Sequence, residues 1–154
     1  MRQPKGALGV KWGDDAASAA DKLSIVCRQW ASWEGGQGFE TCIDFDHLVH
    51  AFEMEAIARL IRHGSNLEGL QLIFQNCAER WDQLCDSVCR EFDLSVDSKT
   101  DIYVTWGSGE AIHLIHDESF RVCTLTIAGA RFGLAYAGYV LGRGFGTLAT
   151  SLKP

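Results

Sequence analysis

The most regular alternation of apolar and polar positions in the chain lies between residues 76 and 94. Its apolar stripe consists of Trp81, Leu84, Cys85, Val88 and Phe92. These residues recur at the three- and four-residue spacing of a helix, and charged residues occupy the opposite side. Asn76 followed by Glu79 is typical of a helix start with a reciprocal capping contact. We therefore expect one amphipathic helix here, packed on a sheet formed by the flanking segments.

Strand patterns precede this helix. Residues 39–45 alternate strictly between apolar and polar side chains, as a strand with one buried face does. Residues 56–62 and 67–74 are also strand-like, and Gly64-Ser65-Asn66 between them predicts a turn. We expect these two segments to form a hairpin.

Further strands follow the helix. They are expected at residues 102–106, 111–116 and 121–128, after a polar loop at residues 97–101. An earlier helix is predicted from Ala16 to Val26, capped by Asp14 or Asp15. The resulting order, α-β-β-β used twice, predicts an α+β fold in which helices cover an antiparallel sheet. We expect a single domain over residues 1–128, with halves at about 8–74 and 76–128.

Residues 129–154 have a different composition. Glycine recurs at positions 129, 133, 138, 142, 144 and 146, with aromatic residues between them and few charges. One interpretation is a tail or a helix at residues 134–141 that packs on the domain. The other is an apolar segment that docks on a partner chain or a membrane surface, since exposed apolar surface is unusual for a lone monomer.

Composition narrows the function. The 154 residues are 47% hydrophobic, as in ordinary globular domains, and the formal net charge of −6 disfavours nucleic acid as a partner. No run approaches the roughly 18 apolar residues of a membrane span. Residues 1–11 contain no secretory signal, so we expect a cytoplasmic location; a periplasmic location is the alternative if a signal peptide has been removed. The six cysteines are interpreted as small core residues in a reducing compartment, with a disulfide to another segment as the alternative.

Two groups of residues are candidates for a functional site. Oxygen and imidazole ligands suitable for zinc cluster at Asp44, Asp46, His47 and His50, although a solvated acidic turn is the favoured interpretation of these residues. His113 and His116 are three apart on a predicted strand, so they should face opposite sides of the sheet.

The second group consists of aromatic candidates for binding anchors. They are Trp30 and Trp33 beside a glycine-rich break, and Phe132, Tyr136, Tyr139 and Phe145 in the apolar segment.

The chain resembles one class of small bacterial domains. Trp12-Gly13 before a capping Asp and a helix with Ala16, Ala20 and Leu23 is similar to their opening. The hairpin at 57–74, the helix at 81–92 and a strand ending in Trp106 stand where these domains have such elements. The class is the β-lactamase-inhibitor-protein and outer-membrane-assembly small-lipoprotein type. This resemblance implies an α+β fold and a protein-binding role, and it carries over no catalytic residues.

We therefore expect a non-enzymatic, adaptor- or chaperone-like module that uses a sheet face or the apolar segment to hold a protein partner or a second copy of itself. The order of helices and strands is also similar, at the level of the fold, to that of dimeric secretion chaperones. No cofactor is expected. The alternatives are a small-ligand-binding domain and a metal-dependent enzyme that uses His47, His50 and nearby carboxylates.

Overall fold

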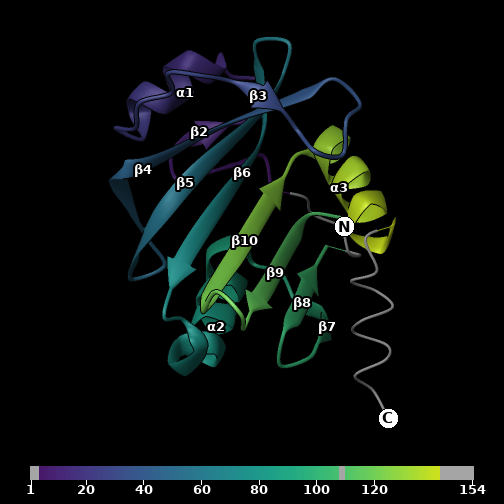
Figure 1. Ribbon diagram of the computed structural model, residues 1–154. Coiled ribbons are helices and arrows are strands. Elements are labelled where there is room, and N and C mark those ends of the chain that lie inside the picture. The colour runs from purple at the N-terminus through teal and green to yellow at the C-terminus, as the bar shows by residue number, and fades with distance from the viewer. Residues whose placement is uncertain (1–3, 108–109, 143–154) are drawn as a thin grey trace.

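The computed structural model describes residues 4–107 and 110–142, and it has the expected α+β architecture (Figure 1). Within these residues, three α-helices pack on a sheet of eight antiparallel strands. The strands of this sheet are β3 (Ala31–Ser32), β4 (Phe39–Ala51), β5 (Met54–His63), β6 (Asn66–Gln75), β7 (Val96–Lys99), β8 (Tyr103–Trp106), β9 (Ile112–Asp117) and β10 (Val122–Ala128). The helices are α1 (Ala16–Lys22), α2 (Trp81–Phe92) and α3 (Ala130–Gly142), with a 3₁₀ turn η1 (Ala78–Arg80) and a small separate hairpin of β1 (Gly6–Ala7) and β2 (Val10–Lys11).

Two meanders form the large sheet. The strand order is β3-β4-β5-β6-β10-β9-β8-β7, so the first meander joins the second where β6 pairs with β10. The second meander has four strands rather than the expected three, because residues 96–99 pair with β8. The prediction of a loop at 97–101 is therefore wrong at its start. The sequence of β7 has no alternation of buried and exposed positions that would predict a strand, because every β7 residue is exposed at the edge of the sheet.

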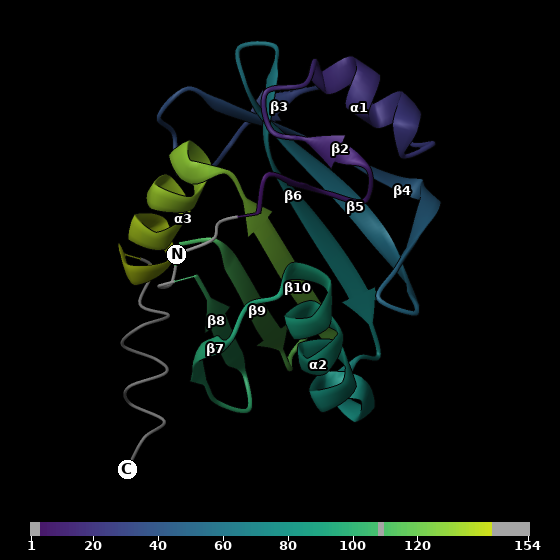
Figure 2. The same cartoon turned by 180° about the vertical axis from the view of Figure 1, so that it is seen from behind.

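The helices are divided between the two faces of the sheet, as the opposite views of Figures 1 and 2 show. α1, α2 and the small hairpin cover one face, and their buried residues share the main core with apolar side chains of β5, β6 and β8–β10. α3 covers only part of the other face, which is called the α3 face below. Helices and the small hairpin therefore cover one face of the sheet, whereas much of the α3 face has no helix over it.

The amphipathic helix is confirmed, but its predicted start is wrong. Leu84, Cys85 and Val88 are buried in the main core, as the stripe requires. α2 begins at Trp81 with no side-chain cap, because Asn76 adopts a left-handed backbone (φ 53°) and donates its N–H to the Arg121 carbonyl. The chain then passes through η1 before the helix starts.

The first helix and the hairpin follow the predictions more closely. Asp15 caps α1 by accepting the Ser18 N–H at 3.2 Å. The helix ends at Lys22 rather than Val26, because Ser24 has a positive φ of 58° and the Val26 N–H donates to the Asp44 carboxylate instead. The hairpin of β5 and β6 is confirmed, with pairing from Ile57 to His63 and one register shift between Ile61 and Arg62.

α3 packs through aromatic side chains. Trp33 is only 2% exposed, and its ring lies 5.0 Å from that of Phe132 and 5.9 Å from that of Phe39. A glycine at position 133 also lets α3 approach the backbone of Glu110, because a Cβ there would overlap the Glu110 carbonyl oxygen. The buried side of α3 thus forms one cluster with β4 and β5, so residues 130–142 belong to the same packed unit as the sheet.

A disulfide joins Cys77, just after β6, to Cys123 in β10. The interpretation of all six cysteines as core thiols is therefore wrong for this pair. Among the described residues, the free cysteines are Cys27, Cys42, Cys85 and Cys89. Cys77 and Cys123 are 46 residues apart, and the pairing of β6 with β10 that brings them together has no local signal in the sequence.

Candidate functional site

The α3 face carries a row of polar side chains across its central strands, called the polar row below. Strand register places Arg59 of β5 opposite Gln71 of β6, Gln71 opposite Thr126 of β10, and Thr126 opposite His113 of β9. Residues directly opposite one another on antiparallel strands bring their side chains within contact distance. The register therefore aligns four polar side chains from four strands.

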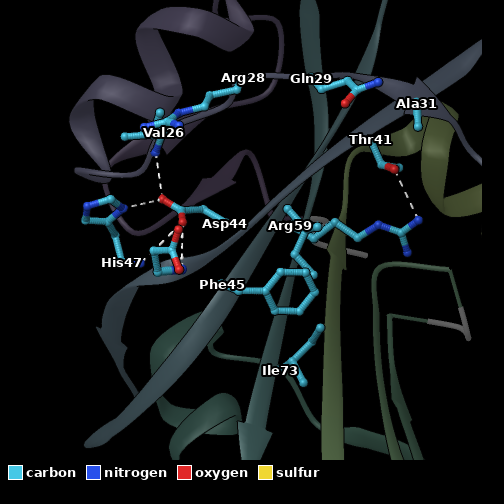
Figure 3. Close-up of a pocket in the computed structure, with 12 residues that line it drawn as sticks. Val26, Arg28, Gln29, Ala31, Thr41, Asp44, Phe45, His47, Arg59 and Ile73 are labelled. Atoms are coloured by element: carbon cyan, nitrogen blue, oxygen red, sulfur yellow. Dashed lines mark hydrogen bonds and ion pairs between the residues drawn. The ribbon is translucent and has the colours of Figure 1, made fainter.

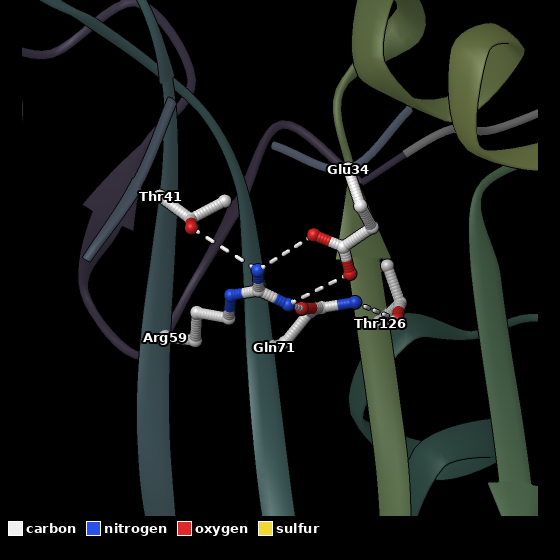
Figure 4. Close-up of polar contacts among 5 residues, drawn as sticks. All are labelled: Glu34, Thr41, Arg59, Gln71 and Thr126. Atoms are coloured by element: carbon white, nitrogen blue, oxygen red, sulfur yellow. Dashed lines mark hydrogen bonds and ion pairs between the residues drawn. The ribbon is translucent and has the colours of Figure 1, made fainter. Parts of the chain in front are cut away.

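Hydrogen bonds connect Arg59, Gln71 and Thr126 of the polar row (Figure 4). Arg59 donates to Gln71 Oε1 at 3.1 Å and to Thr41 Oγ1 at 3.1 Å, and Gln71 Nε2 donates to Thr126 Oγ1 at 3.0 Å. Glu34 accepts from Arg59 at 3.0 Å and so fixes the loop before β4 to the sheet. The Arg59 side chain keeps 22% exposure, whereas Gln71 and Thr126 are buried.

A second, mostly apolar row runs beside the polar row, called the open row below. It consists of Ile57, Ile73, Thr124, Ile115 and Tyr103, each directly opposite the next on the neighbouring strand. All five side chains retain partial exposure. Phe45 extends the apolar surface onto β4 and is 66% exposed. Three isoleucines in line on a sheet face are normally covered, so this surface is available to another molecule.

Of the hollows that adjoin the open row in the described part of the chain, two share Arg59 and Ile73. The larger, of about 710 Å³, lies between β4 and the segment before β3 and is lined by Val26, Phe45 and His47 among others (Figure 3). The other, of about 570 Å³, lies beside α3 and is lined by Ile115, Thr124, Tyr136 and Tyr139 among others. Both volumes fall within the range of about 300–1,000 Å³ typical of small-molecule sites.

The β3–β4 edge of the sheet is less suited to binding than this face. β3 pairs only with Thr41 and Glu40, and beyond them no described strand pairs with the outer side of β4. An irregularity between Asp44 and Val49 interrupts that edge, and Asp44 itself accepts the N–H groups of Val26 and Asp46, both at 2.8 Å. Such irregularities prevent another strand from adding to the edge.

The Asp44 carboxylate is held in its ionised form. Its hydrogen bond from the Val26 backbone N–H is the main cause that lowers the pKa to about 2, against the opposing effect of burial. The Asp46 N–H and the His47 ring, whose Nδ1 lies 2.8 Å from Oδ2, lower the pKa further. Asp44 thus joins the segment before β3 to β4, which is a structural role.

The predicted metal residues do not converge. Asp44 pairs with His47, whereas His50 pairs with Glu55 at 3.2 Å. Asp46 contributes its backbone N–H, and its side chain is exposed. Among the described residues, the one group of three metal-ligating side chains within 4.8 Å of one another is Cys77, His116 and Cys123. The structure therefore places a possible ligand group elsewhere than predicted.

The predicted binding aromatics are mostly internal. Trp33, Phe132 and Tyr136 are each at most 6% exposed, so they are core residues in this arrangement. Trp30 is partly buried beneath the Arg62 guanidinium, whose carbon lies 4.1 Å from the ring centroid. Tyr139 lines the hollow beside α3. Phe145 lies outside the described residues.

The two histidines of β9 face opposite sides, as predicted. The Tyr103 hydroxyl lies 2.8 Å from His113 Nδ1, and His113 also contacts Tyr136 of α3. His116 instead contacts Trp81 at the start of α2. Burial raises the pKa of Tyr103 to about 12, so this phenol keeps its proton at neutral pH.

Comparison with known proteins finds no significant match to a family model, a curated protein or a solved structure. Within the described ranges 4–107 and 110–142, no helix combines the length and apolar character needed to cross a membrane.

The α3 face is suited to binding. Its apolar side chains supply contact area. The guanidinium of Arg59 lies among them and can orient a bound molecule through hydrogen bonds, and Glu34 already neutralises its charge. Sequence reasoning did not find this site, because Ile57, Ile73 and Ile115 are ordinary strand residues one by one. Their shared face follows only from the pairing of β6 with β10.

Proposed function

We propose that the protein is a non-enzymatic module that binds a protein partner, or a second copy of itself, on the α3 face. The single observation that carries this proposal is the open row, whose five side chains are partly exposed beside the hollows. Burial of apolar surface contributes about 25 cal/mol per Å², so covering the exposed part of three isoleucines together with Phe45, which is 66% exposed, supplies apolar contact for an interface centre. The interrupted β4 edge supports binding on the face rather than by strand addition.

The apolar C-terminal segment is a weaker candidate for this role. The buried side of α3 already packs on the sheet, which leaves Leu134 (65% exposed) and Leu141 (66% exposed) as its outward apolar residues. The open row instead aligns five side chains from five neighbouring strands on one face. Residues 143–154, the rest of the predicted docking segment, lie outside the described residues.

A matched pair of variants tests which surface binds. Ile73→Glu places a charge at the centre of the open row, and Leu134→Glu places the same charge on the outer side of α3. Each is compared with the unmodified protein by sedimentation velocity over a range of concentrations and by native mass of the protein purified from its host. We expect Ile73→Glu to abolish self-association or partner retention and Leu134→Glu to leave it unchanged. The reverse result would overturn the proposal.

Small-ligand binding is the second candidate function, and the hollow of about 570 Å³ beside α3 favours it. Its lining combines apolar side chains with the polar row, as ligand sites do. The same native mass measurement distinguishes this function, because a ligand adds a small mass to the monomer. Loss of that mass in Ile73→Glu would assign the ligand to the α3 face, because Ile73 lines both hollows there.

A further inference from the structure

The disulfide lies within a group of metal-ligating side chains at the end of the sheet where α2 begins. The sulfur atoms of Cys77 and Cys123 and a ring nitrogen of His116 all lie within 4.8 Å of one another. These three residues are called the Cys–His cluster below. Cys77 and Cys123 are buried and His116 is partly exposed. Thiolate and imidazole are the ligands that zinc most often takes in proteins.

The backbone holds these residues together independently of the disulfide. Cys123 and His116 are directly opposite on β10 and β9. Cys123 is also opposite Phe74 on β6, three residues before Cys77. The neighbouring Asn76 N–H donates to the Arg121 carbonyl at 3.0 Å, which ties the segment after β6 to the turn before β10. The cluster should therefore persist when the disulfide is reduced.

We propose that the reduced Cys–His cluster binds one zinc ion through the thiolates of Cys77 and Cys123 and the imidazole of His116. Zinc–sulfur bonds of about 2.3 Å in a tetrahedral site place the two sulfurs about 3.8 Å apart. The Cα atoms of the two cysteines are 6.1 Å apart, so side-chain rotation alone can open the bonded sulfurs to that separation. Two thiolates also neutralise the ion's charge at a buried position.

The remaining coordination position has access to solvent. A hollow of about 390 Å³ adjoins the cluster and is lined by His116, Glu79 and Glu118 among others. Water, or one of these carboxylates, is a suitable fourth ligand for zinc. The Trp81 ring, at the start of α2, also contacts His116 with centroids 5.8 Å apart. The hollow thus provides a route for the ion while α2 restricts movement of the imidazole.

Disulfide and zinc exclude each other at this site. A dithiol reductant transfers two electrons and two protons to the disulfide, which yields two thiols and the oxidised reductant. Zinc binding then releases those two protons and forms two zinc–thiolate bonds. The protein would therefore carry the disulfide in an oxidising compartment and the metal in a reducing one. This inference does not depend on partner binding at the α3 face.

Metal titration of the full chain tests the proposal. The protein is reduced with a dithiol, freed of it without air, and titrated with Zn²⁺ or with Co²⁺ as a spectroscopic substitute. We expect one zinc per chain by native mass and a thiolate-to-cobalt charge-transfer band. The oxidised protein should show neither. A reduced protein that binds no zinc would overturn the proposal.

Variants locate the bound metal. Cys77→Ser/Cys123→Ser should lose it, whereas Cys85→Ser/Cys89→Ser, a matched pair in α2 outside the cluster, should retain it. His116→Ala leaves both thiols and should weaken affinity at least about 10-fold, because even outer-shell partners of a metal contribute that much. Binding that survives in the first double variant, or that is lost in the second, contradicts the assignment. Far-UV circular dichroism confirms that each variant is folded.

Discussion

Reduction of the Cys77–Cys123 disulfide should lower the free energy of unfolding by about 4 kcal/mol. The bond closes a loop with a sequence separation of 46, which contains α2, β7, β8 and β9. In the chain-entropy account, a loop of this length restricts the unfolded chain by about 4 kcal/mol at 25 °C. Whole domains are stable by only about 5–15 kcal/mol, so the bond supplies a large share of the total.

Urea unfolding measures this difference directly. The oxidised protein and a sample reduced in denaturant and then refolded are followed by tryptophan fluorescence, both with a metal chelator so that bound zinc adds nothing. We expect the reduced protein to unfold at a clearly lower urea concentration. Cys77→Ser/Cys123→Ser should show no effect of the reductant, and Cys85→Ser/Cys89→Ser should show the full effect.

One result would refute this reasoning. If reduction changes the free energy of unfolding by less than about 1 kcal/mol, well below the 2–4 kcal/mol typical of disulfides, the unfolded chain is not restricted as proposed. An unchanged difference in Cys77→Ser/Cys123→Ser would show that another group responds to the reductant.

Three further predictions concern α3 and two titrating groups. Gly133→Ala should lower the melting temperature, because its Cβ would overlap the backbone, whereas Gly138→Ala, which meets nothing within 4 Å, should raise stability by up to about 1 kcal/mol through helix propensity. Asp44 has a pKa lowered to about 2 from 3.8, so its stabilising effect is complete above pH 4 and is lost between pH 4 and 2; acid titration of Asp44→Asn should lack this loss. Tyr103 has a pKa raised to about 12 from 10.0, so folding resists its ionisation and stability should fall above pH 10, less so in Tyr103→Phe, as monitored by circular dichroism.

The alternation of apolar and polar residues predicted the strands in which buried and exposed side chains alternate. In β5 and β6, Leu60 and Leu70 face the main core while Arg59 and Gln71 face away, so the two-residue period is visible in the sequence. β7 was missed because all of its residues are exposed. The predicted cap at Asn76 failed because a long-range hydrogen bond to the Arg121 carbonyl redirects the chain.

The candidate site depended on pairing over long distances. Gln71 and Thr126 are 55 residues apart and meet only because β6 pairs with β10. The same pairing joins Cys77 to Cys123. A single sequence has no periodicity that relates such positions. A sheet face was predicted as one possible binding surface, but which residues form it required the register.

The β6–β10 seam also has a consequence for synthesis of the chain. β6 is complete at residue 75, yet its partner ends at residue 128, so newly made β4, β5 and β6 must wait for more than a third of the chain. During that interval β6 exposes an unpaired edge with Leu70, Leu72 and Phe74, all of which are fully buried in the finished fold. Unpaired apolar edges favour aggregation, and contacts of large sequence separation form slowly. Translation speed through residues 76–128 should therefore influence the yield of folded protein.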